Sequence, residues 1–111
     1  MGRDGLGELE HQAMLALLRL GRNAYTAPIV EELETRTGRE ATVASVYVIL
    51  RRLEEKGLVT SELRDPGDDG GRDRRYFQVT ESGRERLKAA REAYQRLWDG
   101  LDGALGLGRT P

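Results

Sequence analysis

The spacing of apolar residues changes near Gly57, and that change constrains the fold more than any other feature of the chain. Before Gly57, three segments starting near residues 6, 26 and 42 repeat their apolar positions at about 3.6 residues, the period of a helix. Residues 58–64 alternate instead, as a strand does, and a Gly- and Asp-rich stretch separates them from a second strand at 76–79. Three helices followed by a hairpin are therefore predicted.

A fourth helix is predicted after the hairpin, with an apolar seam along one side. Thr80 is its expected N-cap, as Thr26 and Thr42 are for the second and third helices, because a threonine hydroxyl accepts a hydrogen bond from the first turn. A seam of apolar residues at alternating spacings of three and four is typical of a helix that pairs with a partner helix. The expected dimer interface consists of Leu87, Ala90, Tyr94, Leu97, Trp98 and Leu101.

Composition excludes several classes of function. The chain has 111 residues, no cysteine and one histidine, His11, so disulfide scaffolds, thiolate metal sites and most acid–base catalysts are excluded. We therefore expect one domain, no cofactor, no metal and no enzymatic activity. No apolar run is long enough to span a membrane, which predicts a cytoplasmic protein without a membrane partner. His11 itself is expected at the surface or in an interface.

The predicted third helix has two different faces. Its expected core face carries Val43, Val46, Ile49, Leu50 and Leu53, whereas the opposite face is small, polar and basic. Residues 43–52 contain two arginines and no acid, although an ordinary solvated helix mixes both signs. A helix of this kind can enter the major groove of DNA while an adjacent hairpin lays basic side chains along the phosphates. The expected DNA-binding residues are Thr42, Ala44, Ser45, Tyr47, Val48, Arg51, Arg52, Arg72, Arg74 and Arg75.

The pattern predicts a mostly α, α+β fold, namely a winged helix-turn-helix with a C-terminal dimerisation helix. Residues 1–79 are the expected DNA-binding domain and residues 80–105 the dimerisation helix of the same compact unit. Glycines recur beyond Trp98, so fraying is expected from about residue 103, with residues 106–111 as a frayed tail. Residues 23–26 are expected to form a loop or one short strand.

Two stretches of sequence, residues 45–59 and 71–84, resemble the PadR family of bacterial transcriptional regulators. The resemblance covers roughly residues 6–100 and implies a dimeric repressor whose third helix contacts operator DNA. Tyr47 and Arg51 match the family's Tyr and Arg on that helix, and the arginines of the hairpin return match its basic wing. Residues 42–45 depart from the Pro or Ser-Gly-Thr-like step with which the family usually opens the helix.

Other interpretations of these residues are open. Tyr47 could pack against the wing or the first helix, Arg52 could pair with Glu55 or Glu32, and the hairpin arginines could be merely solvated. Tyr94 and Trp98 could line a pocket for a small aromatic or apolar effector between subunits. The acidic wing tip, with Asp65, Asp68 and Asp69, would repel phosphates and is expected to point into solvent.

The function predicted from these features is sequence-specific DNA binding by a homodimeric repressor at a near-palindromic operator. The net charge of −1 and the pI of 5.9 argue for an alternative, a winged-helix module that binds another protein and not DNA. Residues 72–96, however, carry eight cations against four acids, so basic surface is concentrated in this part of the chain.

Overall fold

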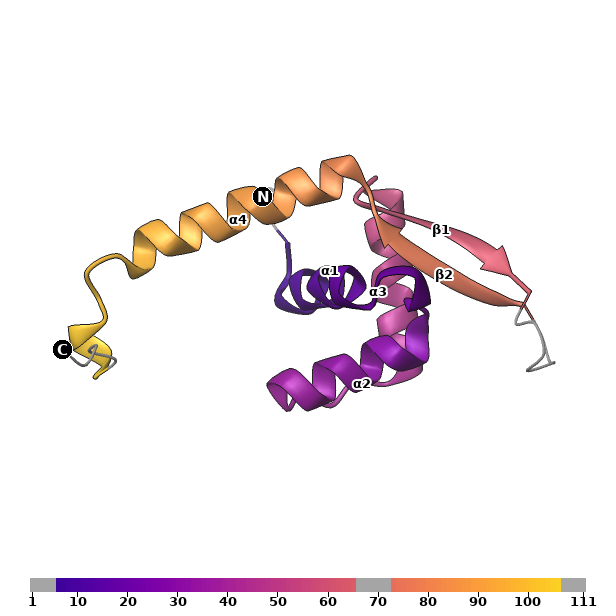
Figure 1. The fold of residues 1–111 in the computed structure, drawn as a ribbon, viewed down its shortest axis with the longest axis horizontal. Coiled ribbons are helices and arrows are strands. Elements are labelled where there is room, and N and C mark those ends of the chain that lie inside the picture. Colours follow the sequence, from indigo (N-terminus) through magenta and orange to yellow (C-terminus); the bar gives the residue numbers. More distant parts are fainter. Residues whose placement is uncertain (1–5, 66–72, 107–111) are drawn as a thin grey trace.

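The computed structural model describes residues 6–65 and 73–106. The order of elements is the predicted one, and the fold is mostly helical α+β with a two-stranded antiparallel sheet in the described residues (Figure 1). The elements are α1 (Glu8–Leu20), the short 3₁₀ turn η1 (Gly21–Asn23), α2 (Thr26–Thr37), α3 (Val43–Glu55), β1 (Val59–Arg64), β2 (Arg74–Val79), α4 (Glu81–Trp98) and a last 3₁₀ turn η3 (Gly103–Leu105).

The core lies where α1, α2 and α3 meet the base of the hairpin. Met14 of α1 is fully buried in this core. On α3 the predicted core residues Val46, Leu50 and Leu53 are fully buried and Ile49 is partly buried. Val43 was predicted to be in the core, but it is 53% exposed. It stands in the first turn of α3, where a side chain tilts toward the N-terminus and past the packed layer.

The helix caps agree with the sequence in two of three cases. Thr42 accepts a hydrogen bond from the Ser45 amide, and Thr80 accepts one from the Gly83 amide, both at 3.0 Å. The predicted cap at Thr26 is wrong, because Thr26 is already the first residue of α2. Tyr25 stands in the N-cap position instead, with an extended backbone whose carbonyl accepts from the Ile29 amide at 3.3 Å.

The predicted loop or strand at residues 23–26 is a two-residue loop, Ala24 and Tyr25, because Asn23 ends η1 and Thr26 begins α2. A single backbone hydrogen bond of 2.8 Å, from the Phe77 amide to the Ala24 carbonyl, places this loop along the outer edge of β2. The loop therefore covers one edge of the hairpin without extending the sheet.

The register of the hairpin assigns each side chain to one of its two faces. Val59 pairs with Val79, Ser61 with Phe77, and Leu63 with Arg75, so these pairs lie on the face toward α3. The intervening pairs, which end with Arg64 opposite Arg74, lie on the far face. Neighbouring residues of β2 therefore point to opposite sides of the wing.

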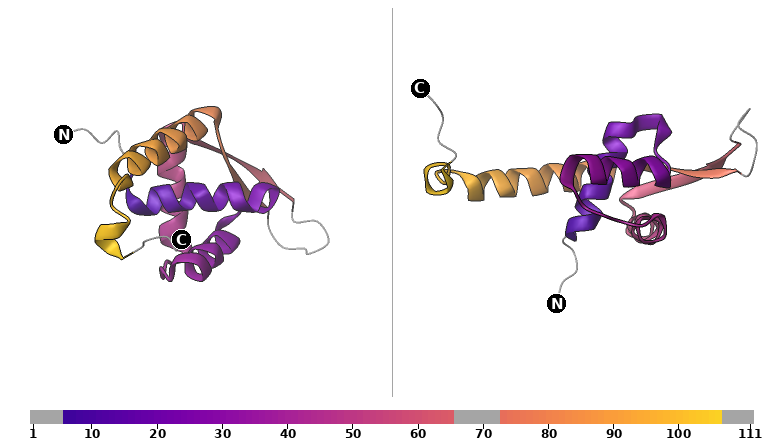
Figure 2. Two further views of the ribbon diagram at one scale, coloured as in Figure 1. Left: turned by 60° about the vertical axis from the view of Figure 1, so that its left-hand side comes forward. Right: turned by 90° about the horizontal axis from the view of Figure 1, so that it is seen from below.

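Only the beginning of α4 packs against the rest of its own chain. Gly83 and Leu87 are buried, whereas the helix beyond Ala93 is exposed and projects from the body, giving overall dimensions of 54 × 33 × 22 Å (Figures 1 and 2). At Gly83 a Cβ would collide with the carbonyl oxygen of Leu58, so glycine is required where α4 crosses the start of the hairpin.

The predicted extent of the C-terminal helix, to residue 105, is too long. The α-helix ends at Trp98, because Asp99 leaves the helical conformation with a φ of −54° and a ψ of 125°, and Gly100 has a φ of 82°. Leu101 therefore lies outside the helix on which its spacing placed it. The described residues beyond α4 form the 3₁₀ turn η3, which ends at Gly106 with a φ of 72°.

Candidate nucleic-acid interface

The outer face of α3 is open to solvent. Tyr47 is 39% exposed and Val48 is 49% exposed. The remaining predicted contact residues of this helix are exposed as well: Thr42, Ala44, Ser45, Arg51 and Arg52. The structure thus gathers on one surface all the α3 residues that the sequence assigned to DNA.

Tyr47 combines two environments that the sequence left as alternatives. Its ring packs edge-on against Phe77 of β2, with the ring centroids 6.1 Å apart. Its hydroxyl accepts a hydrogen bond of 3.4 Å from Nη1 of Arg51, and the Arg51 guanidinium lies 5.9 Å from the Tyr47 ring centroid. Packing on the wing therefore holds Tyr47 in place and leaves its polar end beside an arginine.

A chain of polar contacts continues from Arg51 to the wing. Nε of Arg51 lies 3.4 Å from Oε1 of Glu54, and the Ser61 hydroxyl of β1 donates to both Glu54 oxygens at 2.8 and 3.0 Å. Nη1 of Arg75 on β2 then donates to the Ser61 hydroxyl at 2.9 Å. We call Tyr47, Arg51, Glu54, Ser61 and Arg75 the helix–wing chain. It fixes two predicted DNA-binding arginines relative to each other.

Sequence reasoning missed Glu54 and Ser61. Glu54 follows Arg51 by three residues, a spacing that permits an ion pair on a helix, and this was the available signal. Ser61 offered no comparable signal, because its contact with Glu54 depends on the angle at which β1 leaves α3.

Arg74 and Arg75, both expected on the basic return of the hairpin, lie on opposite faces of β2. Arg75 faces α3, whereas Arg74 lies on the far face with its guanidinium 4.5 Å from the Tyr25 ring centroid. Arg64 lies 4.2 Å from the Tyr76 ring centroid on that same face, and the Tyr25 and Tyr76 rings meet edge-on at 5.3 Å. The third predicted wing arginine, Arg72, lies outside the described residues.

The acidic tip falls largely in the same undescribed segment. Asp68 and Asp69 are outside the described residues, and Asp65, the last residue described before them, is exposed.

Arg52 belongs to a different electrostatic group from Arg51. In the described part of the chain it forms no ion pair with Glu55 or Glu32, and Glu32 pairs instead with Arg36 at 2.8 Å. Arg52 acts at longer range on Glu10 of α1, together with Lys56.

Glu10 ties α1 to the end of α3. Its carboxylate accepts from Nζ of Lys56 at 2.9 and 3.1 Å and from the Gly7 amide at 2.9 Å. Burial raises the pKa of this carboxyl, but the Gly7 hydrogen bond and the positive charges of Lys56 and Arg52 together hold its pKa below the ordinary value. A buried, ionised glutamate therefore anchors the C-terminal end of α3.

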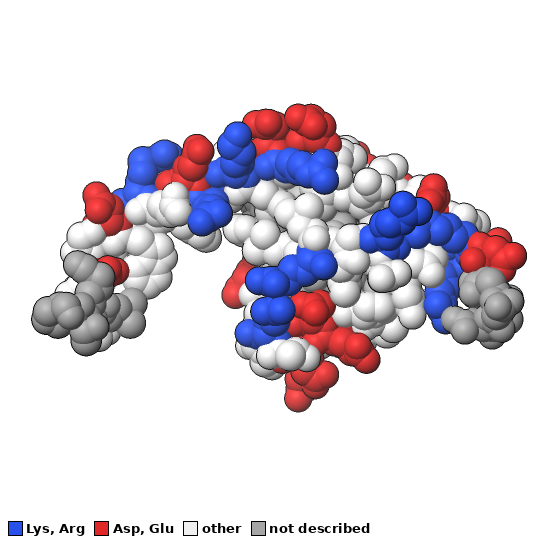
Figure 3. Space-filling view, viewed as in Figure 1, with Lys and Arg blue, Asp and Glu red and all other residues white. Residues whose placement is uncertain are grey.

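The charge pattern of one face of the molecule is mixed. Figure 3 shows basic side chains over the base of the hairpin and along α4, with acidic side chains between them. The basic surface is local, as the uneven distribution of charge along the sequence predicted.

The predicted dimer seam divides into two parts. Leu87 is 7% exposed and belongs to the core of its own chain, and Ala90 is partly buried, so Leu87 offers little surface to a partner. Tyr94, Leu97 and Trp98 are 59%, 69% and 47% exposed on the projecting half of α4. Leu101, 44% exposed, follows after the helix has ended.

A groove of about 470 Å³ runs between α1 and α4, and both residues of the predicted effector pocket line it. Tyr94 stacks on His11 with their ring centroids 6.4 Å apart, and Trp98 lies further along. Leu15 and Leu18 of α1 supply apolar surface, whereas the charged residues in the lining are Arg84, Lys88 and Arg91. This α1–α4 groove is apolar with a cationic border.

Within residues 6–65 and 73–106, no three metal-ligating side chains come together as a possible site. No helix in this described part is both long and apolar enough to span a bilayer.

A family model described as the transcriptional regulator PadR-like family matches residues 14–89. This chain belongs to that PadR-like family. The matched region runs from α1 through α3 and the hairpin into α4, and it ends before Tyr94. Membership assigns the chain to DNA-binding regulators of transcription with a winged-helix fold, a family of regulators and not of enzymes.

Solved structures agree with this assignment. A PadR family transcriptional regulator from Eggerthella lenta is 30% identical, with a TM-score of 0.65 over 86% of this chain and 82% of that one. A PadR family transcription regulator from hypervirulent Clostridium difficile is 20% identical, with a TM-score of 0.75 over 89% of this chain and 99% of that one. The latter is similar in fold. A comparison with curated proteins gave no match.

Proposed function

We propose that this PadR-like protein is a sequence-specific repressor that binds a near-palindromic operator as a homodimer. The observation that carries the proposal is the exposed, acid-free start of α3, joined through the helix–wing chain to Arg75 of the wing. Two basic groups on different elements are thereby held in one arrangement before any ligand binds. Such preorganisation favours a rigid partner of regular geometry, and duplex DNA is one.

The proposed contacts follow from the side chains. With α3 in the major groove, the Thr42 hydroxyl and the amides of Val43 and Ala44 are donors for phosphate. The Ser45 hydroxyl, which donates to the Thr42 carbonyl at 3.1 Å, becomes a further donor when it turns toward the DNA. Ala44 and Val48 supply apolar contact of the kind that a thymine methyl makes. Arg51 contacts base edges or phosphate beside Tyr47, with Arg52 at the border of the helix.

The wing contributes through Arg75, which lies on the same side of the hairpin as α3. Arg74 and Arg72 were expected to share this role. For Arg74 a phosphate contact requires DNA that also reaches the far face of the hairpin, where its guanidinium lies over Tyr25. Arg75 is therefore the stronger candidate.

Dimerisation is proposed to use the projecting half of α4. Tyr94, Leu97 and Trp98 expose a large apolar area that nothing in the described chain covers. Figure 3 shows a hollow between this half of α4 and the body formed by α1 and α2, into which a second copy can fit. Pairing there would set two recognition helices about one helical turn, ~34 Å, apart on the DNA.

A small aromatic or apolar effector is proposed to bind in the α1–α4 groove beside Tyr94 and Trp98, and thereby to change how the subunits are paired. The protein is expected to act in the cytoplasm, where its DNA is.

The test is fluorescence anisotropy of the purified protein with duplex DNA from upstream of its own coding sequence, at two salt concentrations and with random duplex as competitor. Specific binding should resist the competitor and weaken as salt is added. The logarithm of the association constant should fall with the logarithm of the salt concentration, with a slope of roughly 0.9 for each phosphate that the protein neutralises. Absence of binding at low salt would contradict the proposal. It would favour the alternative of a winged-helix module for a protein partner, which the pI of 5.9 supports.

A further inference from the structure

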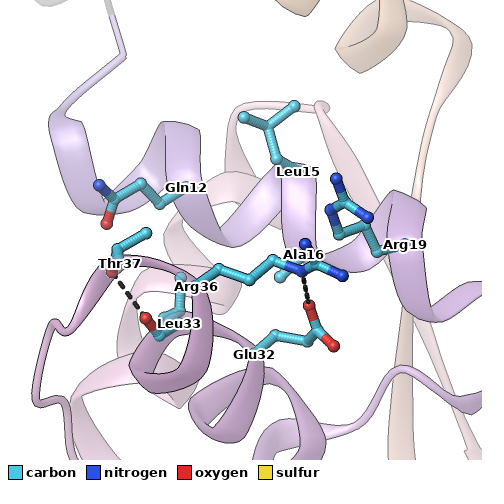
Figure 4. Close-up of a pocket in the computed structure, with 8 residues that line it drawn as sticks. All are labelled: Gln12, Leu15, Ala16, Arg19, Glu32, Leu33, Arg36 and Thr37. Carbon is cyan, nitrogen blue, oxygen red and sulfur yellow. Dashed lines mark hydrogen bonds and ion pairs between the residues drawn. The ribbon is translucent and has the colours of Figure 1, made fainter.

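A second groove lies between α1 and α2, separate from the predicted DNA face (Figure 4). It has a volume of about 130 Å³, and Leu15, Ala16 and Leu33 form its apolar surface. Arg19 of α1 and Arg36 of α2 stand at its border. We call this the α1–α2 groove. Leu15 also lines the α1–α4 groove, so the two grooves adjoin at this residue.

The polar groups of the α1–α2 groove are incompletely paired. Arg36 donates its Nε to Glu32 at 2.8 Å, whereas Arg19 has no ion-pair partner among the residues described. The amide oxygen of Gln12, which also lines the groove, is buried and accepts no hydrogen bond within residues 6–65 and 73–106. An occupant with carboxylates and backbone amides would satisfy both groups.

The residues that follow α4 have the complementary chemistry. Residues 99–106, here named the C-terminal segment, contain two aspartates and no cation. Their two leucines, Leu101 and Leu105, are 44% and 56% exposed. The Leu105 amide donates to the Leu101 carbonyl at 3.3 Å, so one closed turn brings the two leucines together. Figure 1 and the right-hand view of Figure 2 show this segment standing apart from α1 and α2 of its own chain.

We propose that the C-terminal segment of one subunit packs into the α1–α2 groove of a second copy. Leu101 and Leu105 then cover the apolar surface at Leu15 and Leu33, and Asp102 lies near Arg19. This inference rests on the homodimer proposed above and adds a second contact to it. A partner helix that packs along the projecting half of α4 would bring the residues that follow it toward Leu15, which borders the α1–α2 groove.

The size of the α4 seam supports this addition. Three exposed side chains, Tyr94, Leu97 and Trp98, are a small contact when a stable interface covers about 800 Å² on each partner. In a two-fold dimer each subunit donates one C-terminal segment and receives one, so the added area counts twice.

Disulfide cross-linking tests the contact directly, because the natural chain has no cysteine. One variant carries Arg36→Cys in the groove and another carries Ala104→Cys in the C-terminal segment. The two are mixed in equal amounts and oxidised mildly. The covalent heterodimer should form at least about tenfold faster than in a control mixture of Glu62→Cys with Ala104→Cys, because contact raises the effective concentration of the thiols. Glu62 lies on the far face of the hairpin.

A charge reversal gives a second readout. Arg19→Glu and Asp102→Arg should each raise the dimer dissociation constant, by about two- to fivefold for an exposed pair, and the double variant should restore it. The matched control is Arg22→Glu in η1, which should change nothing because Arg22 does not line the groove. Dissociation constants are measured by sedimentation equilibrium.

The outcomes separate this inference from the proposed function. The inference would be overturned, and the proposed repressor left intact, if the wild-type protein is a dimer but the mixture of Arg36→Cys with Ala104→Cys cross-links no faster than the control mixture and the charge reversals are additive. A wild-type protein that sediments as a monomer would overturn both. If the chain carrying both Arg36→Cys and Ala104→Cys forms its disulfide within one molecule, the segment occupies its own groove, and the role of a second copy is wrong.

Discussion

The two ends of this molecule differ in how much of their structure is supported by their own chain. At the wing end, α3 and the hairpin both contribute to the core and to the helix–wing chain. Contacts within one chain therefore hold Arg51 and Arg75 in place. At the other end, the last turns of α4 expose Tyr94, Leu97 and Trp98 and have little contact with the body. The described residues of the proposed DNA surface are thus held in place by their own chain, whereas the described chain leaves the apolar side chains at the end of α4 exposed.

The largest effect is expected from Leu97→Asp, which tests whether the projecting half of α4 is a dimer interface. A charge in the seam should raise the dimer dissociation constant by about 100-fold or more, as at an interface hot spot. The thermal unfolding of the subunit should barely change, since Leu97 is 69% exposed in the monomer. Light scattering and circular dichroism measure the two quantities. A variant that remains dimeric would show that the subunits meet elsewhere.

Gly83→Val tests the joint between the two ends. The added side chain meets the Leu58 carbonyl, Val79 and Met14, so it should lower the free energy of unfolding by about 3 kcal/mol. Gly103→Ala is the control, because nothing lies within 4 Å of a Cβ there. Equal stability of the two variants in urea denaturation would contradict the close packing of α4 on the hairpin.

Arg51→Ala tests the wing end alone. It should weaken specific operator binding by about 2 kcal/mol while dimerisation is retained. Tyr47→Ala should have a similar effect on binding, with a small loss of stability from the contact with Phe77. Anisotropy titrations measure the affinity. Unchanged affinity in both variants would remove α3 from the proposed mechanism.

Arg75→Ala and Arg74→Ala form a matched pair on opposite faces of one strand. The first should weaken binding by about 1 kcal/mol and reduce the salt slope by roughly 0.9, the value for one phosphate contact. The second should leave the slope unchanged and lower only the stability of the hairpin, because its guanidinium lies over Tyr25. If Arg74→Ala alters the slope instead, the DNA reaches the far face of the wing.

Replacing Glu10 should have the smallest effect on the free energy of unfolding, and that effect should depend on pH. Because its pKa is lowered in the folded protein, its ionised form stabilises the fold above the ordinary carboxyl range, and this contribution is lost as the pH falls through the lowered pKa. Glu10→Gln should therefore cost less than about 1 kcal/mol at neutral pH, since Lys56 is 37% exposed. The difference from wild type should vanish in acid-titrated urea denaturation, and a constant difference would contradict the ion pair.

The element order was predictable because each boundary depends on local chemistry, such as the caps at Thr42 and Thr80 and the positive φ of Gly21, Gly38 and Gly57. The predicted helix boundaries are wrong where two local signals compete. Both Tyr25 and Thr26 can precede a helix, and the apolar spacing continued to Leu101 although Gly100 had already ended the helix.

The exposed face of α3 was predictable from its period, but the contacts between elements were not. Arg74 and Arg75 must point to opposite faces of the hairpin, because successive side chains alternate in any strand. Which of the two faces α3 depends on the register, which sets Arg75 opposite Leu63 across a segment that carries no periodic signal. The link from Glu54 to Ser61 depends on the same geometry.

The joint at Gly83 also makes α4 a lever arm. Thr80 bonds to the carbonyls of Gly57 and Leu58 through its hydroxyl and amide, at 2.8 and 3.0 Å, and Gly83 lies against the same turn. Helix α3 ends at that turn, so the orientations of α3 and α4 are coupled within a few residues. In the proposed dimer, a small change in the angle between the two α4 helices would therefore cause a larger displacement of the two α3 helices. That displacement would change the distance between the two half-sites that the dimer can bind.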